Sequence, residues 1–145
     1  MTRVDFYILP DVDLEARRRF ACRLACLAVT RGQRVHVHLD DAAASTDFDA
    51  LLWAYPDNRF VPHAVGGELQ TIDAPVLIGH TVPDHDFADL LINLGGAVPS
   101  FFGRFERVAE IIVQQLREDG RQRYKFYRDR GYPLFHHELD QWDDR

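Results

Sequence analysis

Apolar residues recur along the chain with two spacings, one typical of helices and one typical of strands. Between residues 13 and 31, the apolar positions fall on one helical face, and the opposite face carries Arg17, Arg18, Arg19 and Arg23. Asp13 is the expected N-cap of this helix, and Gly32 is its expected stop signal. The pattern predicts an amphipathic helix whose arginines form the polar side.

Strand-like segments alternate with such helical patterns through the rest of the chain. The predicted strands span residues 4–10, 33–39, 75–79, 90–94 and 107–113, and the further helices span 47–54 and 114–130. Strands separated by helices indicate an α/β domain with a mostly parallel sheet. We expect a single domain over residues 1–145, in which the acidic tail at 138–145 frays unless Trp142 docks on the body.

Composition and charge narrow the class of protein. The 145 residues fit one domain, and 17 basic against 23 acidic residues give a net charge of −6, so no overall positive field attracts nucleic acid. No segment approaches the ~20 apolar residues of a membrane span, and no signal peptide precedes the first strand, which predicts a cytoplasmic protein. Cys22 and Cys26 share a helical face and are expected to be buried free thiols.

Motifs for catalysis or cofactor binding are scarce. The chain has no glycine-rich phosphate-binding motif and no nucleophile elbow, so no cofactor is expected. The one metal-like pattern is His36, His38 and Asp40, which the period of a strand places on one face. A small metal-dependent hydrolase is therefore the alternative enzyme hypothesis, against histidines that are simply bonded to their neighbours.

The C-terminal region departs from the acidic balance of the chain. Residues 121–130 hold five of the 17 basic residues together with three aromatics. On a helix, one stripe would contain Arg117, Arg121, Tyr124, Lys125 and Arg128. Such a stripe suits an acidic peptide with an apolar end, and the alternatives are a solvated basic face or single-stranded nucleic acid. A helix that starts after Gly120 would exclude Arg117 from the stripe.

A second aromatic cluster surrounds a predicted turn and contains Trp53, Tyr55, Phe60 and Pro62. Aromatic residues in such a segment either anchor a protein interface or cover the core. The sequence pattern alone leaves both interpretations open.

Several segments resemble the DNA polymerase III chi subunit family. They are residues 99–110 (PSFFGRFERVAE), 121–132 (RQRYKFYRDRGY), 6–9 (FYIL), 31–35 (RGQRV), 52–56 (LWAYP) and 60–63 (FVPH). The segments extend over nearly the whole chain and occur in the family's order. The resemblance implies a Rossmann-like fold without a nucleotide site and a non-catalytic accessory role in replication.

The resemblance also implies two protein partners. Chi subunits bind the acidic, phenylalanine-terminated tail of single-stranded-DNA-binding protein, and they join the clamp loader through the psi subunit. By motif position, the tail site would fall on Arg117, Arg121, Tyr124, Lys125 and Arg128, and the psi site on Trp53 and Phe60. We expect a monomer when the protein is alone, with DNA contacted only indirectly. Position 117 is arginine where the family pattern has lysine, which keeps the charge but changes the hydrogen-bonding geometry.

Overall fold

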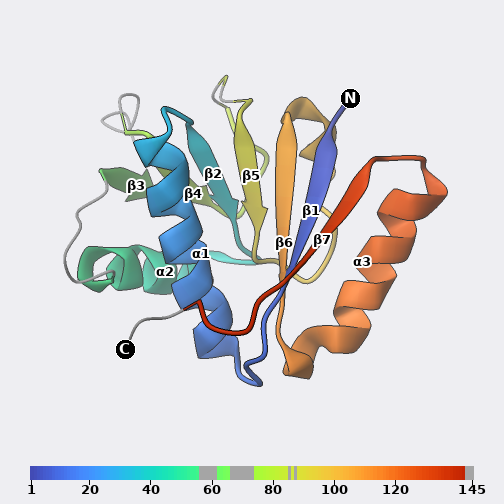
Figure 1. The fold of residues 1–145 in the computed structure, drawn as a ribbon. Coiled ribbons are helices and arrows are strands. Elements are labelled where there is room, and N and C mark those ends of the chain that lie inside the picture. Colours follow the sequence, from blue (N-terminus) through green and yellow to red (C-terminus); the bar gives the residue numbers. More distant parts are fainter. Residues whose placement is uncertain (56–61, 66–73, 85, 87, 143–145) are drawn as a thin grey trace.

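The strands form one sheet in the computed structural model, which describes residues 1–55, 62–65, 74–84, 86 and 88–142 (Figure 1). The strands are β1 (Arg3–Ile8), β2 (Val35–His38), β3 (His63–Val65), β4 (Val76–Gly79), β5 (Leu90–Asn93), β6 (Arg107–Ile112) and β7 (Leu134–Glu138). Their order in the sheet is β3-β4-β2-β5-β6-β1-β7, and every neighbouring pair is parallel. The α/β fold predicted from the sequence is confirmed.

Helices cover both faces of this sheet. The described part of the chain contains α1 (Leu14–Thr30), α2 (Ala42–Ala54) and α3 (Arg117–Asp129), with the 3₁₀ turns η2 (Phe102–Arg104) and η3 (Gln114–Leu116). The helices α1 and α2 share one core with alternate residues of the central strands, whereas α3 and the segment around η2 pack on the opposite face. Figure 1 shows α2 toward the β3 edge and α3 toward the β7 edge.

Local signals in the sequence set the ends of α1. The Asp13 side chain accepts a hydrogen bond from the Ala16 amide at 3.0 Å, and Gly32 follows the helix with a φ of 80°. Both expected signals are therefore confirmed. Cys22 and Cys26 are buried thiols outside any disulfide, also as predicted.

The prediction for Arg17 was wrong. Its side chain lies inside the molecule, where the guanidinium donates hydrogen bonds to the carbonyl groups of Asn93, Leu94 and Ile111. A long side chain on a helix beside a sheet can reach the open carbonyls at the ends of the strands, and helical periodicity does not show this.

The main departures from the predicted pattern are the start of one helix and two additional strands. Helix α2 begins at Ala42 instead of residue 47, because the Asp41 side chain caps it through the Ala44 amide at 2.8 Å. The strands β3 and β7 were not predicted at all. Both are edge strands of the sheet, and none of their residues is fully buried, so they lack the continuous apolar run of the central strands.

The residues after β7 were expected to fray unless Trp142 docked on the body, and the structure shows Trp142 docked. The chain crosses to α1, where the indole Nε1 of Trp142 donates to Asp11 Oδ1 at 2.8 Å and the ring lies edge-on to Phe20 at 5.4 Å (Figure 1). The tail is therefore docked as far as Trp142.

Candidate functional site

The structure brings the predicted basic stripe to a single cavity between α3 and the β1–β7 edge of the sheet. The cavity measures about 550 Å³. It is lined by all five residues of the stripe, namely Arg117, Arg121, Tyr124, Lys125 and Arg128. The helix continues through Gly120, so Arg117 lies at its first turn and belongs to the same surface. We call this surface the α3 cavity.

Gly120 allows α3 to approach the sheet closely. A Cβ atom added at this position would lie 2.7 Å from Ile112 Cδ1, which is closer than packed carbon atoms tolerate. The glycine that weakens the helix locally therefore permits the contact that seats the helix on β6. This close approach makes the strand residues the floor of the α3 cavity.

The floor of the α3 cavity is aromatic and apolar. The Tyr124 ring lies edge-on to Phe6 at 5.4 Å and tilted against His136 at 5.2 Å, and Ile8 and Ile112 complete the apolar part. Sequence reasoning missed Phe6 and His136 as site residues. The available signal for a strand at this position was the alternation of Leu134, His136 and Glu138. This signal is weak, because two of these three residues are polar and a second histidine is adjacent to His136.

The cations at the rim are only loosely engaged. Arg121 lies 3.4 Å from Glu118, and Arg128 lies 3.1 Å from Asp129, and in both pairs the side chains are largely exposed. Surface ion pairs of this kind contribute little stability, so carboxylates of a ligand can replace them. Arg117 and Lys125 have no ion-pair or hydrogen-bond partner among the residues that the structure describes. The cavity therefore has unneutralised positive charge above an apolar floor.

A buried polar network holds α3 in place beneath this surface. Arg123 Nε lies 2.8 Å from Glu110 Oε1, and the Tyr127 hydroxyl donates to Glu110 Oε2 at 2.8 Å. Asn93 Nδ2 donates to the same carboxylate at 2.9 Å. Burial and the Glu110 charge raise the pKa of Tyr127, so it stays protonated as a donor. These bonds fix the rotation of the helix, which directs the basic stripe outward.

The second predicted surface lies at the other end of the sheet. Trp53 is 63% exposed near the end of α2, and its ring is edge-on to His63 of β3 at 4.9 Å. Phe60, the other residue predicted for this surface, lies outside the described residues. The structure therefore separates the Trp53 surface from the α3 cavity by the full width of the sheet (Figure 1).

Comparisons with known proteins agree with this architecture. A family model described as "DNA polymerase III chi subunit, HolC" matches residues 1–135. A DNA polymerase III subunit chi from Pseudomonas aeruginosa is 42% identical over 141 residues, which cover 96% of this chain and 98% of that protein. The chain belongs to the DNA polymerase III chi subunit family.

More distant chi subunits match over similar lengths. The Escherichia coli protein is 32% identical over 92% of this chain and 96% of its own length. The Haemophilus influenzae protein is 30% identical over 89% of this chain and 92% of its own length. Membership in the chi family gives the chain an accessory role in DNA replication, as a subunit of DNA polymerase III. None of the described helices of this chi-family chain is long and apolar enough to span a membrane.

The residues of the alternative metal site have other neighbours in this chi-family fold. The His36 and His38 rings lie edge-on to Phe101 at 5.8 and 5.3 Å. The Asp40 carboxylate accepts from the Gly96 amide at 3.0 Å, and burial lowers the pKa of His38. Within the described ranges, no three histidine, cysteine or carboxylate side chains form a group that could hold a metal.

Proposed function

We propose that this chi-family chain is a non-catalytic adaptor whose α3 cavity binds the acidic, phenylalanine-terminated tail of single-stranded-DNA-binding protein. The observation that carries the proposal is the meeting of five predicted residues at one cavity with an aromatic floor. Arginine side chains bind carboxylates with charge-assisted hydrogen bonds, and an apolar floor accommodates a terminal aromatic ring.

The parts of the cavity have separate roles in this proposal. Arg121, Lys125 and Arg128 would receive the carboxylates of the tail, and Tyr124 would seat the phenylalanine beside Phe6. Glu138 also lines the cavity, on β7. A carboxylate there repels acidic residues of the tail, so the tail should enter from the α3 side.

A fluorescent tail peptide tests this function directly. It should bind saturably, and a peptide that lacks the final phenylalanine should bind at least roughly tenfold more weakly, since burial of a phenylalanine side chain contributes about 1.5 to 3 kcal/mol. Arg128→Ala should weaken binding by ~1 to 3 kcal/mol, the range for a lost charged hydrogen bond. Undetectable binding of the complete peptide would refute the proposal.

Arg130→Ala is the matched control for Arg128→Ala. Arg130 follows α3 directly and carries the same charge, but its guanidinium lies over the Phe126 ring at 3.6 Å and donates to the Phe126 carbonyl. It does not line the α3 cavity. If both variants lose affinity equally, the net charge of the chain and not the cavity would explain binding.

We also propose that the Trp53 surface, with Phe60 assigned from sequence alone, binds the psi subunit and so links the tail to the clamp loader. An exposed tryptophan beside a polar rim is typical of an interface anchor. In a pull-down, Trp53→Ala and Phe60→Ala should lose psi and retain the tail peptide. Loss of the tail instead would overturn the assignment of the two surfaces. In the same proposal the isolated chain is a cytoplasmic monomer that contacts DNA only through its partners.

Direct binding of single-stranded DNA is the competing function. It would give an oligonucleotide affinity that falls steeply with salt and that requires no tail peptide. The adaptor proposal predicts no measurable oligonucleotide binding by the chain alone.

A further inference from the structure

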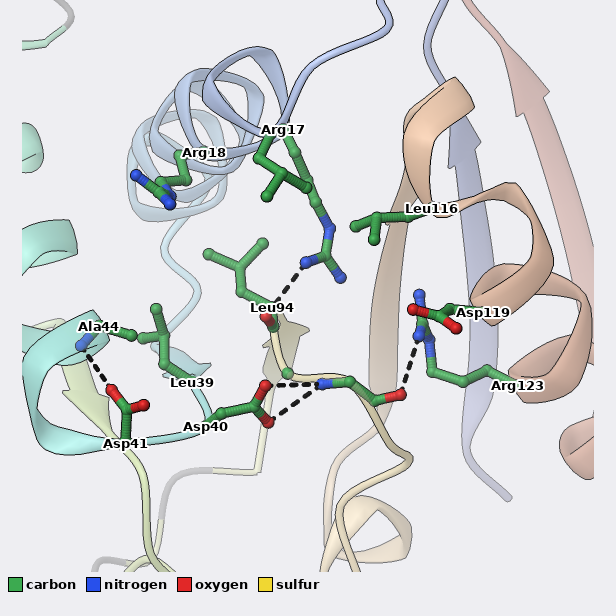
Figure 2. A pocket seen from close by; sticks show the side chains of 13 residues that line it. Arg17, Arg18, Leu39, Asp40, Asp41, Ala44, Leu94, Leu116, Asp119 and Arg123 are labelled. Atoms are coloured by element: carbon green, nitrogen blue, oxygen red, sulfur yellow. Dashed lines mark hydrogen bonds between the residues drawn. The ribbon is translucent and has the colours of Figure 1, made fainter.

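The buried cations of the chain are compensated within the fold. Figure 2 shows Arg17 and Arg123 beside a cavity of about 290 Å³ at the carboxyl ends of β2 and β5. Arg123 lies 2.8 Å from Glu110, and the carboxylates of Asp40 and Asp119 line the same cavity. The cations of the α3 cavity have only exposed ion pairs or none among the described residues, and they lie beside β7. An anionic partner is therefore expected near β7.

The strand β7 forms the edge of the sheet beside α3 (Figure 1). At its two ends, the Pro133 carbonyl accepts from the Val4 amide and the Leu139 amide donates to the Ile8 carbonyl, each at 3.0 Å. Backbone groups of a strand point alternately to its two sides, so the odd-numbered residues from 133 to 139 bond to β1. The even-numbered residues of β7 direct their backbone groups away from the sheet.

These outward backbone groups belong to Leu134, His136 and Glu138. None of them bonds to another residue in the described part of the chain. After Glu138 the chain turns toward α1, where Trp142 docks, so the described tail leaves this edge uncovered (Figure 1). The close approach at Gly120 seats α3 on β6 and not on the edge itself. The edge is therefore accessible to a further strand.

β7 also lacks the features that usually block an open edge. Natural proteins block such edges with very short strands, proline, lysine or bulges. Residues 134–138 contain neither proline nor lysine, and their register with β1 has no bulge. The strand at the opposite edge, β3, has only three residues. An unblocked edge of five residues is long enough to pair with an extended peptide.

Cations border this edge on both faces of the sheet. On the α3 face they are the cations of the basic stripe, which line the cavity together with His136. On the other face, Arg3 and Arg107 share a single carboxylate, that of Asp5. The Arg3 guanidinium lies 4.0 Å from the centroid of the Phe135 ring, which is 41% exposed. The side chains of an added strand would thus meet positive charge on either face, which favours an acidic segment.

We propose that the acidic tail of single-stranded-DNA-binding protein pairs with β7 as an eighth strand of the sheet. This inference rests on the tail-binding function proposed above, and it adds how the backbone of the tail is held. An acidic segment repels itself and is already extended before it binds. Backbone hydrogen bonds to Leu134 and His136 hold the tail, and the α3 cavity selects its side chains and its terminal phenylalanine.

Amide hydrogen exchange of the full chain, measured by NMR, tests the pairing. In the free chain, the amides of Leu134, His136 and Glu138 should exchange at least roughly tenfold faster than those of Phe135 and His137, which bond to β1. Saturating tail peptide should slow the amides of Leu134 and His136 at least roughly tenfold and leave the odd-numbered amides unchanged. Binding of the peptide without this alternating protection would overturn the pairing and leave the tail-binding function intact.

Backbone-methylated tail peptides test the same pairing from the side of the partner. Methylation of a peptide nitrogen removes one donor and keeps every side chain and charge. At four successive positions of the acidic segment, affinity should fall at least roughly tenfold at two alternate positions and less than about twofold at the others, because alternate amides face β7. Equal losses at all four positions would overturn the pairing. Failure of the unmethylated peptide to bind would instead refute the tail-binding function.

A proline variant removes one outward donor from β7 itself. His136→Pro lacks the outward amide and keeps the bonds to β1, and an edge strand tolerates proline where the nitrogen faces solvent. His136→Ala is the matched control, because it removes the same side chain and keeps the amide. The proline variant should bind the tail at least roughly fivefold more weakly than the alanine variant. Equal affinity would overturn the pairing, and if the proline variant does not fold, the exchange pattern and the methylated peptides decide.

An open edge can also pair with the same edge of a second copy of the chain. Sedimentation of the free chain should show a monomer, and the outward amides should stay unprotected as its concentration rises. A dimer whose formation protects the amides of Leu134, His136 and Glu138 would overturn the assignment of this edge to the tail.

Discussion

The two ends of the sheet carry helices that are held in different ways. At the β7 end, α3 is anchored by a buried ion pair and a tyrosine hydroxyl that converge on Glu110. At the β3 end, α2 is anchored mainly by the buried side chains of Phe48 and Leu52. The outer surfaces differ as well, because α3 exposes a row of cations and α2 exposes Trp53.

This difference shows how one fold can offer two chemically different surfaces, each suited to a different kind of partner. The buried residues of α3 are Gly120, Arg123 and Tyr127, so directed bonds beneath the helix help to determine its rotation. A helix with an apolar buried face is seated by packing alone. We therefore expect binding at the α3 cavity to depend on charge, and binding at the Trp53 surface to depend on apolar contact.

Removal of Glu110, which anchors α3 to the sheet, should have the largest effect on the stability of the fold. Glu110→Ala leaves the Arg123 guanidinium buried without its carboxylate, which should lower the free energy of unfolding by about 3 to 5 kcal/mol. Urea denaturation measures this loss. The double variant Glu110→Leu with Arg123→Leu should recover much of it, because no unpaired charge then remains. A single variant with unchanged stability would show that the network does not anchor the helix.

The close approach of α3 to β6 gives the next largest effect. Gly120→Ala improves helix propensity by about 1 kcal/mol, but its Cβ would meet Ile112 Cδ1 at 2.7 Å. We expect a net loss of about 1 to 2 kcal/mol, because overpacking exceeds the gain in propensity. Adding Ile112→Val removes the Cδ1 atom and should restore stability. A stabilised Gly120→Ala protein would contradict the packing argument.

Ionic strength should have a moderate effect on binding, and the effect should differ between the α3 cavity and the Trp53 surface. Raising the ionic strength from about 0.05 M to about 0.3 M should weaken tail-peptide binding roughly fivefold, since the contacts are exposed charges. Binding of psi at the Trp53 surface should change by less than about twofold. Fluorescence anisotropy for both ligands in the same buffers checks this, and equal salt dependence would remove the distinction between the surfaces.

The smallest effect should come from Asp5, which joins β1 to its neighbours β6 and β7 at the α3 end. Burial alone would raise the pKa of Asp5, but hydrogen bonds from Arg3 and His137 and the Arg107 charge lower it below its ordinary 3.8. A lowered folded-state pKa contributes stability that is present above about pH 4 and is lost as the pH falls through the folded-state pKa.

Asp5→Asn should therefore flatten the acid side of the stability profile. The free energy of unfolding, measured by urea titration at several pH values, should fall less below about pH 4 in the variant than in the parent chain. The exposed Asp84 provides the control, and Asp84→Asn should leave the slope unchanged. An unchanged slope in Asp5→Asn would show that other carboxylates dominate acid unfolding.

Local patterns predicted much of the fold and the residues of the basic stripe. The central strands, α1 with its Asp13 cap, and the helix at the end of the chain all followed from periodicity and capping signals. The edge strands β3 and β7 did not, and neither did Phe6 and His136 in the α3 cavity. Those residues join the stripe only because β1 and β7 pair across more than a hundred residues of sequence.

The sequence by itself determined an α/β chain with a cationic, aromatic stripe on its last helix, because helical periodicity and charge spacing are local properties. Only the tertiary structure placed Phe6 and His136 opposite that stripe. It also decided that the Arg17 side chain turns inward to the ends of the strands. The physical reason is that a cavity is formed by segments distant in sequence. The buried guanidiniums of Arg17 and Arg123 come from helices separated by most of the chain, and no local pattern records their approach.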